Sequence, residues 1–218
     1  MKIAVIPFFN EEGTIGKVVS ETRRYVDKVL AVDDGSYDHG YLQAERAGAI
    51  VLRQPINMGK GFTLQTGCDR ALSLGADVIV LIDGDGQHDP ADIPRLVGLL
   101  KKGGLDLVFG SRSLDRNMPA TKKIGNWLIS KSAKALFGVD VKDTQSGFKV
   151  ISAGAYEKLR WESRNYAVES EIIMMAGRTH LKYGEAVIKT IYTDKFRGTT
   201  IIDGLKIILN MLWWRVSK

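Results

Sequence analysis

The stretch Val78–Pro90, VIVLIDGDGQHDP, decides the fold of this chain. Its first five residues are apolar, and they run directly into turn-forming residues, so the stretch predicts a short buried strand that ends in a loop. Asp83 and Asp85 stand two residues apart in that loop. Carboxylates this close repel each other unless a cation or an array of donors lies between them. Because Mg²⁺ and Mn²⁺ bind to carboxylates and to substrate phosphates, the pair predicts a site for a hard divalent ion.

Strand-like and helix-like segments alternate upstream and downstream of this stretch. The predicted strands are Lys2–Phe8, Lys28–Val32, Ala49–Leu52, Val78–Ile82 and Leu105–Phe109. The predicted helices are Thr14–Tyr25, Tyr41–Ala47, a helix that opens at the loop 57–61 and runs to Leu74, and Pro90–Lys102. This order predicts repeated βαβ units, and therefore an α/β domain with a mostly parallel central sheet.

Four polar clusters each follow a predicted strand. They are Asn10–Glu12, Asp33–Ser36, Asp83–Gln87 and Ser111–Arg112. In open α/β sheets ligands bind beyond the carboxyl ends of the strands. We therefore expect the four clusters to converge on one edge of the sheet.

After residue 112 the pattern is looser. We expect helices over Lys122–Phe137, Tyr166–Arg178 and Ile201–Trp214, a strand over Ala186–Tyr192, and no assigned element in the polar stretch within Val141–Val150. The chain has no repeats, low-complexity tracts or Pro/Gly/Ser linker. We expect one domain over residues 1–200, followed by an amphipathic helix over residues 201–218.

Composition and charge bound the function. The 218 residues suffice for one α/β domain with a substantial core. Cys68 is the single cysteine, so no internal disulfide forms, and a reducing compartment is expected. Residues 1–110 carry 12 lysines and arginines against 15 acidic residues, whereas residues 111–218 carry 19 against 10. An acidic half fits a metal and a basic half fits phosphates or an anionic membrane surface, although an unbalanced solvated surface would give the same numbers.

Several familiar sites are excluded. The chain has no G-x-x-x-x-G-K-[ST] motif, no G-x-G-x-x-G after its first strand, no H-E-x-x-H, no cysteine cluster and no G-x-S-x-G. No secretory leader and no apolar run of about 18 residues is visible, so no segment is expected to span a bilayer. A calcium-binding EF-hand loop is excluded because Gln87 stands at the fifth position of that pattern. A simple Asp-rich turn remains an alternative explanation of Asp83 and Asp85.

Seven motifs together resemble family 2 glycosyltransferases of GT-A fold, and among them the dolichol-phosphate mannose synthase and polyprenol-phosphate glycosyltransferase branch. They are IPFFNEE (6–12), VDDGS (32–36), NMGKGFTLQTG (57–67), DGDGQHDP (83–90), GSR (110–112), DTQSGFK (143–149) and FRGTT (196–200). They occur in the family's order over about residues 3–203. The resemblance implies a single Rossmann-like, nucleotide-diphospho-sugar transferase domain and an inverting, metal-dependent transfer of mannose or glucose to a polyprenol or dolichol phosphate.

The resemblance also implies roles for matched positions. The nucleotide-sugar would meet Pro7, Asn10, Glu12, Asp34, Gly59, Lys60, Asp83 and Gly84. Mg²⁺ or Mn²⁺ would be held by Asp83, Asp85 and Gln87. The catalytic set would be Asp85, Arg112 and Arg197, and the acceptor phosphate would meet Arg112, Lys122, Lys123 and Arg197. GDP-mannose and UDP-glucose are the expected donors, and no nucleic-acid partner is expected.

The acceptor leaves two readings open. A lipid monophosphate is already anionic, so its attack needs positive charge nearby rather than a general base. A glycan hydroxyl or small-molecule acceptor would need a base, for which Glu169, Glu171 or Asp143 are candidates. A catalytically silent nucleotide-binding or scaffold protein is a third reading, which the intact Asp83 and Asp85 pair disfavours.

The last predicted helix ends in Trp213-Trp214-Arg215. Tryptophan beside basic residues is typical of a helix at a membrane interface, whereas the same apolar face would also suit packing on the sheet. We expect the protein to act in the cytoplasm, peripherally attached to the cytoplasmic face of a membrane.

Overall fold

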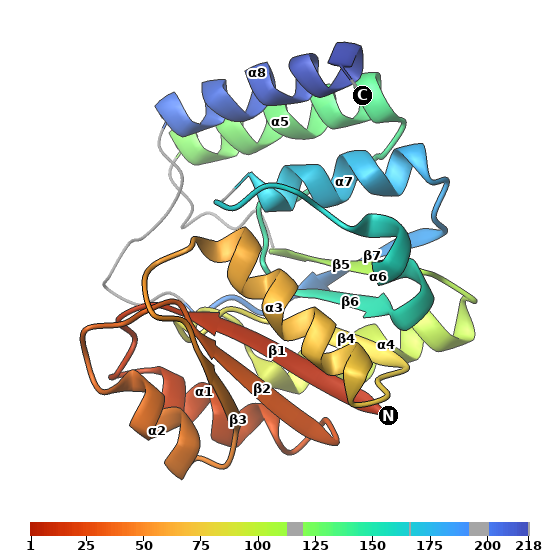
Figure 1. Ribbon diagram of the computed structural model, residues 1–218. Coiled ribbons are helices and arrows are strands. Elements are labelled where there is room, and N and C mark those ends of the chain that lie inside the picture. The colour runs from red at the N-terminus through yellow and green to blue at the C-terminus, as the bar shows by residue number, and fades with distance from the viewer. Residues whose placement is uncertain (113–119, 166, 192–200, 218) are drawn as a thin grey trace.

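A mostly parallel sheet covered by helices on both faces organises the protein (Figure 1). The structure is a computed structural model that describes residues 1–112, 120–165, 167–191 and 201–217. Its strands are β1 (Lys2–Phe8), β2 (Lys28–Asp33), β3 (Ile50–Arg53), β4 (Val78–Leu81), β5 (Leu107–Arg112), β6 (Lys149–Ser152) and β7 (Tyr183–Ile188). Its helices are α1 (Ile15–Thr22), α2 (Gly40–Arg46), α3 (Lys60–Ser73), the 3₁₀ turn η1 (Pro90–Asp92), α4 (Ile93–Lys102), α5 (Ala120–Phe137), α6 (Ala153–Leu159), α7 (Val168–Arg178) and α8 (Ile201–Ser217).

The described strands form one seven-stranded sheet in the order β3-β2-β1-β4-β6-β5-β7. β1 pairs in parallel with β2 and β4, β2 pairs in parallel with β3, and β5 pairs in parallel with β7. β6 lies between β4 and β5 and runs antiparallel to both. The predicted α/β class with a mostly parallel sheet is confirmed, and β6 is its reversed strand.

The apolar runs in the sequence arise because the sheet is buried on both faces. Along β1, Ile3 and Val5 belong to one core cluster, whereas Ala4 and Ile6 belong to the other. Successive side chains of a strand point to opposite faces, so a strand covered on both sides has no polar position to break its run.

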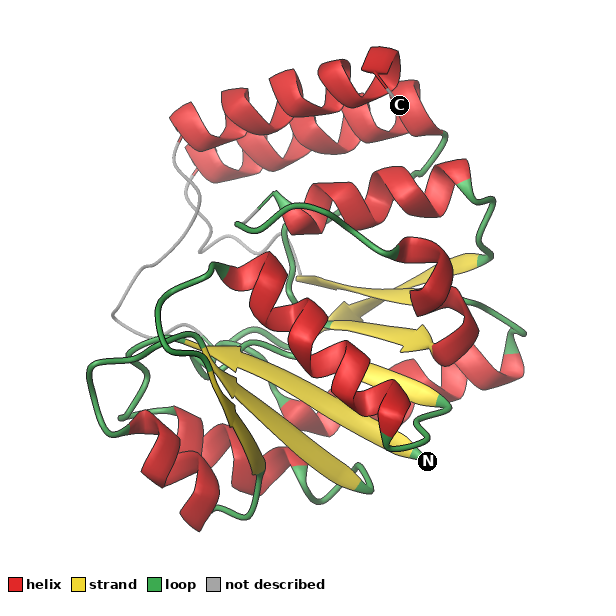
Figure 2. Ribbon diagram, in the orientation of Figure 1, coloured by secondary structure: helices red, strands yellow, loops and turns green. Residues whose placement is uncertain are grey.

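The helices form two outer layers, as Figures 1 and 2 show. Helices α3, α5, α6, α7 and α8 contribute residues to the first core cluster, and α1, α2 and α4 contribute to the second. Each βα connection leaves the sheet at its carboxyl edge, so the loops after β1, β2 and β4 gather there.

The sequence-based elements are confirmed with small shifts in their ends, and two elements were missed. The predicted strand at Leu105–Phe109 begins and ends later, at Leu107 and Arg112, and the predicted strand at Ala186–Tyr192 begins earlier, at Tyr183. The missed elements are β6, which begins at the last residue of the DTQSGFK motif, and α6, which follows β6 directly. β6 has four residues and opens on a lysine, so it carries little of the apolar signal that marks the other strands.

Helix α8 lies against α5 and near α7 rather than on the sheet (Figure 1). Ile207 and Met211 are buried in the first core cluster, while Trp213 and Val216 are exposed. The helix is therefore apolar on both its packed and its outer side. Among the helices that the structure describes, none combines the length and the apolar content needed to cross a bilayer.

Candidate active site

The polar clusters after β1, β2 and β4 meet at the carboxyl edge of the sheet. The backbone N–H of Asn10 donates to Ser36 Oγ at 2.9 Å, which joins the first loop to the second. The Thr14 hydroxyl donates to the Gly84 carbonyl at 2.9 Å, which joins the first loop to the loop after β4. A Cβ built on Gly84 would lie 2.9 Å from Phe8 Cβ, so only glycine lets these two loops approach so closely.

The first loop is fixed by residues that the family resemblance assigns to the nucleotide. The Asn10 side-chain oxygen accepts from the Tyr37 N–H at 2.9 Å, and Asn10 itself adopts a left-handed backbone with φ of 55°. The Glu12 N–H donates to Asp38 at 2.9 Å. Pro7 lies within β1 opposite Val32 of β2. Asn10 and Glu12 therefore bind the first two loops to each other.

Asp34 holds the loop that precedes α3. Its carboxylate accepts from the Met58 N–H at 2.7 Å and from the Gly59 N–H at 3.0 Å, and the residue is buried. Gly59 has φ of 92°, a left-handed conformation that disfavours other residues. Asp34 thus fixes the backbone that carries Lys60 into the site.

A surface cavity of about 430 Å³ lies beside this loop. It is lined by Gly35, Ser36, Tyr37, Arg53, Gln54 and Pro55. Arg53 is fixed there by a 3.2 Å ion pair with Asp33 and lies 4.2 Å above the Tyr41 ring. The Gln54 side-chain oxygen is buried without a hydrogen-bond partner among the described residues. The exposed aromatic ring of Tyr37 belongs to the lining of this cavity.

The N-terminus of α3 is clamped by the chain between α6 and α7. The Gly61 N–H donates to the Arg164 carbonyl at 2.6 Å, and the Trp161 indole N–H donates to the Gly61 carbonyl at 2.8 Å. The Glu171 carboxylate in turn accepts from the Ser163 N–H at 2.7 Å. A Cβ on Gly61 would lie 1.9 Å from the Ser163 carbonyl oxygen, so this close approach requires glycine.

Lys60 connects the predicted metal loop to α7. Its ammonium lies 2.7 Å from Asp83 Oδ1 and 3.0 Å from Glu169 Oε1. Glu169 also forms an ion pair with Lys149 of β6. His88 lies on the other side of Asp83, with Nε2 3.7 Å from Oδ2. The two lysines and two carboxylates alternate in charge at the end of β4, and the His88 imidazole lies at one end of the row.

The pKa values in this cluster follow the pairing. Burial by itself lowers the pKa of the Lys60 ammonium, but Asp83 and Glu169 outweigh burial and raise that pKa well above its ordinary value. Burial raises the pKa of Asp83, but the Lys60 ammonium and His88 overcome it and hold that pKa far below the ordinary range. Lys60 and Asp83 are therefore charged, as an ion pair.

Asp85 is the less satisfied carboxylate of the pair. Its Oδ1 accepts from the Gln87 N–H at 3.0 Å, and its pKa is raised first by burial and then by the charge of Asp83. A divalent cation between Asp83 and Asp85 would relieve this repulsion, so the two carboxylates fit such an ion. Across residues 1–112, 120–165, 167–191 and 201–217, no three His, Cys, Asp or Glu side chains are spaced to hold a metal. Within the part of the chain that the structure describes, Gln87 is the predicted third ligand, and water or a bound phosphate would complete the set.

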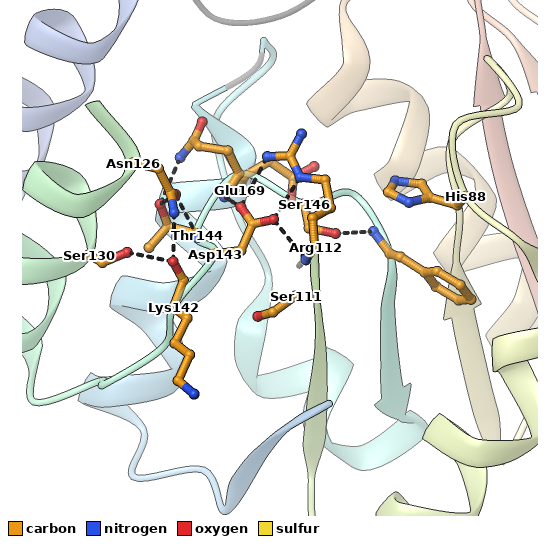
Figure 3. Close-up of polar contacts among 12 residues, drawn as sticks. His88, Ser111, Arg112, Asn126, Ser130, Lys142, Asp143, Thr144, Ser146 and Glu169 are labelled. Atoms are coloured by element: carbon orange, nitrogen blue, oxygen red, sulfur yellow. Dashed lines mark hydrogen bonds and ion pairs between the residues drawn. The ribbon is translucent and has the colours of Figure 1, made fainter. Parts of the chain in front are cut away.

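Arg112, at the end of β5, is held by Asp143 (Figure 3). Arg112 Nε and Nη2 donate to the two carboxylate oxygens at 2.7 and 3.1 Å, a bidentate pair. Asp143 also accepts from the backbone N–H groups of Arg112 and Gln145, both at 3.1 Å. Burial raises the pKa of Asp143, but these bonds to Arg112 overcome it and lower the pKa. Asp143 therefore orients Arg112 and is a poor proton acceptor.

The chain around Asp143 brings α5 and the metal loop together. Asn126 and Ser130 of α5 donate to the Lys142 carbonyl at 2.6 and 3.3 Å (Figure 3). A Cβ on Gly147 would lie 2.2 Å from Asp83 Oδ2, so the backbone at Gly147 lies directly against the Asp83 carboxylate. The fourth predicted cluster thus reaches the same edge through the DTQSGFK motif.

Part of the predicted acceptor site lies outside the described residues. Arg197 is among residues 192–200, and the side chains of Lys122 and Lys123 are likewise not described, although both residues lie within α5. Of the predicted set, the structure brings together Asp34, Gly59, Lys60, Asp83, Gly84, Asp85, Gln87 and Arg112.

The sequence assigns no role to Lys149 and offers Glu169 only as one of three candidate bases. Lys149 is almost fully buried, and its ammonium donates to the Ser146 carbonyl as well as pairing with Glu169. Lys149 and Glu169 are 20 positions apart in the sequence, so no local sequence pattern predicts their contact. The one available signal is a lysine that interrupts the otherwise apolar run FKVIS.

Solved structures share this arrangement of sheet and helices. Glucosyl-3-phosphoglycerate synthase from Mycobacterium tuberculosis, in complex with phosphoglyceric acid, superposes with a TM-score of 0.77 at 23% identity, covering 99% of this chain and 79% of that chain. The same enzyme has been solved with Mn²⁺ and UDP-glucose, and that structure superposes with a TM-score of 0.74. The fold is therefore that of a GT-A glycosyltransferase.

The model of Glycosyl transferase family 2 matches residues 3–160. The chain is 34% identical over 240 residues to the UDP-N-acetylglucosamine–dolichyl-phosphate N-acetylglucosaminyltransferase of Methanococcus voltae, covering 98% of this chain and 96% of that protein. It is 27% identical over 216 residues to the undecaprenyl-phosphate mannosyltransferase of Micrococcus luteus, covering 93% of this chain and 87% of that protein. The chain belongs to glycosyl transferase family 2, and it is a glycosyltransferase.

Proposed function

We propose that this enzyme transfers a hexose from a nucleotide-sugar to a polyprenol phosphate of the dolichol type, with inversion at the anomeric carbon and with Mg²⁺ or Mn²⁺ at Asp83 and Asp85. The names of the relatives from Methanococcus voltae and Micrococcus luteus specify dolichyl and undecaprenyl phosphates, which supports a lipid phosphate as acceptor. The proposed donors are GDP-mannose and UDP-glucose.

One observation carries the choice of acceptor. The three carboxylates named from the sequence as candidate general bases for a hydroxyl acceptor are already bound. Glu169 lies between two lysines, Glu171 accepts from two backbone N–H groups, and Asp143 holds Arg112. To take a proton from a hydroxyl, each of these carboxylates would have to give up contacts that it makes in the structure. An acceptor that is already anionic needs no such base, which favours a phosphate over a hydroxyl.

The proposed reaction moves no proton. The bond between the sugar C1 and the β-phosphate oxygen breaks, and its electron pair stays on the diphosphate. An oxygen of the lipid monophosphate forms the new bond to C1 from the opposite face. A bound divalent ion would supply charge stabilisation for the leaving diphosphate. Arg112, kept in place by Asp143, would draw the acceptor phosphate toward C1 against the repulsion of the donor phosphates, with Lys122, Lys123 and Arg197 as its proposed partners.

The donor would bind across the first three loops. We assign the nucleotide base to the cavity beside Tyr37 and Gln54, because an exposed aromatic ring lines it. Asp34 fixes Gly59 and Lys60 next to it, and Lys60 leads from there to Asp83. The proposed path of the donor therefore runs from the cavity, through the diphosphate at Lys60, to the sugar at Asp85.

The outer faces of α5 and α8 support attachment to a membrane surface. Apolar side chains are exposed on both helices, namely Ile124, Trp127 and Leu128 on α5 and Leu209, Leu212, Trp213 and Val216 on α8. Exposed tryptophan beside lysine and arginine suits the boundary between lipid headgroups and acyl chains. We place the enzyme peripherally on the cytoplasmic face, where a lipid phosphate would be within reach.

The proposal is tested by incubating the protein with GDP- and UDP-sugars, Mn²⁺ or Mg²⁺, and either a polyprenyl phosphate in vesicles or soluble hydroxyl acceptors. A lipid-linked sugar with one donor is expected, and the D85A variant should reduce its formation by about 1,000-fold, which corresponds to about 4 kcal/mol. Transfer only to soluble hydroxyl acceptors, or no transfer with any donor, would contradict the proposal. Unchanged turnover in D85A would remove the metal assignment.

A further inference from the structure

Lys60 occupies the place of a cation beside Asp83. Its ammonium is shared between Asp83 Oδ1 and Glu169 Oε1, at 2.7 and 3.0 Å. Asp83 is a residue that the proposed function assigns to the divalent ion. A metal ion and Lys60 therefore compete for one carboxylate.

The two carboxylates that contact Lys60, those of Asp83 and Glu169, differ in how accessible they are to solvent and ligands. Glu169 is buried and has a second cation, Lys149, whose side chain is 2% exposed and is also bound to a backbone carbonyl. Lys60 is 16% exposed and Asp83 is 23% exposed. The Glu169–Lys149 pair is thus a fixed part of the core, and the contact between Lys60 and Asp83 is the part that solvent and ligands can reach.

With Lys60 in place, only the negative charge of Asp85 is left without a lysine partner in the cluster. Lys60 and Lys149 neutralise Asp83 and Glu169, and Asp85 adds one negative charge. A divalent ion that arrives alone must push the ammonium off Asp83, and two cations then share a poorly solvated site. When a diphosphate arrives with the ion, the displaced ammonium has a new anionic partner close by. Because Glu169 still holds its other side, the Lys60 ammonium needs only to pivot.

We propose that Lys60 is the resident counter-ion of Asp83 in the empty enzyme, and that it moves onto the donor diphosphate when metal and nucleotide bind together. The proposal rests on the proposed function, because it uses the same donor and metal. It predicts that metal binds poorly without nucleotide, and that Lys60 is the cause. The pivot makes the Glu169–Lys149 pair a positioning unit for Lys60.

The test measures Mn²⁺ binding by electron paramagnetic resonance of the free ion, without nucleotide and with UDP or GDP. In the wild-type enzyme one nucleotide should strengthen Mn²⁺ binding by about 100-fold, within the usual range of coupling between two ligands. In K60M, Mn²⁺ alone should bind about tenfold more tightly than in the wild type, and the strengthening by nucleotide should fall to about tenfold or less. Glu169 keeps Lys149 in this variant, so the core pair is intact.

Three controls separate charge from other effects. K60R keeps the positive charge and should keep Mn²⁺ binding weak in the absence of nucleotide. K102M removes an exposed lysine of α4 and should leave both affinities unchanged. The double variant K60M/D85N should lose the tight Mn²⁺ binding of K60M, which shows that the ion is held at the carboxylate pair. Circular dichroism on each variant verifies that the fold is retained.

The outcomes distinguish this inference from the proposed function. If the wild type shows nucleotide-strengthened Mn²⁺ binding but K60M binds Mn²⁺ alone no more tightly, the inference is overturned and the proposed function stands. If K60R behaves like K60M, the positive charge is not the cause, and the inference is overturned as well. If neither UDP nor GDP strengthens Mn²⁺ binding in the wild type or in K60M, the proposed donor site fails, and the inference fails with it.

Discussion

Asp34 and Asp83 are two carboxylates at the same edge of the sheet, and the protein holds them in opposite ways. Asp34 accepts from backbone N–H groups of Met58 and Gly59, which cannot leave without refolding the loop. Asp83 is held by the Lys60 ammonium, the end of a long side chain with several rotatable bonds. The first region is a scaffold that fixes the chain before α3, whereas the second is an exchangeable arrangement of charges.

The difference teaches where ligand-dependent change is expected. A carboxylate that satisfies backbone donors is costly to disturb, because the donors would remain buried and unpaired. A carboxylate that is bound by a mobile ammonium can change partners when another anion offers itself. We therefore expect substitutions in the first region to affect folding, and those around Asp83 to affect binding, with one exception at the buried end of the cluster.

That exception is the largest expected effect. K149M removes one of the two cations on Glu169, which is buried, and leaves it with Lys60 alone. Breaking a buried ion pair from one side costs about 3–5 kcal/mol, so the free energy of unfolding should fall by about 3 kcal/mol or more in urea titrations. The matched double variant K149M/E169L, which removes both charges, should recover much of this loss. A loss under about 1 kcal/mol in K149M would show that Glu169 does not depend on Lys149.

G147A tests the mobility of Asp83 directly. The added methyl group would lie 2.2 Å from Asp83 Oδ2, so the carboxylate has to turn away from its present position. We expect kcat to fall by about 100-fold, or about 2.7 kcal/mol, because a ligand of the proposed metal is displaced. The unfolding free energy should change less, by about 1–2 kcal/mol. G154A, at a glycine of α6 with open space around it, is the control and should keep wild-type kcat.

D34N tests the backbone-held carboxylate. The amide has nearly the same shape, but one oxygen becomes an NH₂ group that faces a backbone N–H. We expect a loss of about 2 kcal/mol in unfolding free energy, typical of hydrogen bonds to a charged acceptor. Hydrogen exchange at Gly59 should accelerate, because its N–H loses its partner. If exchange at Gly59 is unchanged while donor binding is lost, Asp34 serves the ligand rather than the loop.

The smallest effect concerns Asp143. This carboxylate is held in both ways, by backbone N–H groups as Asp34 is and by a side-chain cation as Asp83 is. Its pKa is lowered in the folded protein, because its bonds to Arg112 outweigh burial. A lowered pKa contributes stability that is present above the unfolded-state pKa of about 4 and is lost as the pH falls through the folded pKa. The difference in unfolding free energy between wild type and D143N should therefore be full at pH 7 and shrink below about pH 4. A difference that does not change with pH would contradict the pairing.

The sequence predicted the sheet well because the physical signal is strong there. β1, β2 and β4 are covered on both faces, so each appears as an uninterrupted apolar run followed by polar residues. β6 escaped because it has four residues, begins with Lys149 and runs against its neighbours. The other strands were predicted from the alternation of strands and helices in βαβ units, and an antiparallel strand does not belong to that alternation.

The residues of the site could be predicted from the sequence, whereas most contacts between them could not. Strand ends placed Asp34, Asp83 and Arg112 at one edge, since parallel strands end there. The partners of these groups depend on contacts between distant segments. The bond between Arg112 and Asp143 spans 31 positions, and the pair of Lys149 with Glu169 spans 20, so no spacing in the sequence reports them.

The reversed strand β6 has a consequence for how this enzyme acquires specificity. β5 ends at Arg112 and β6 begins at Lys149, and Phe109 of β5 lies in register with Lys149. Everything between them, including the proposed acceptor residues of α5, leaves and re-enters the sheet at the same edge. The length of this insert can therefore vary without shifting the register of any strand, although Asp143 and Gly147 near its end are tied to Arg112 and Asp83. A change of acceptor could then be confined to the part of this insert before Asp143, while the loops proposed to bind the donor stay unchanged.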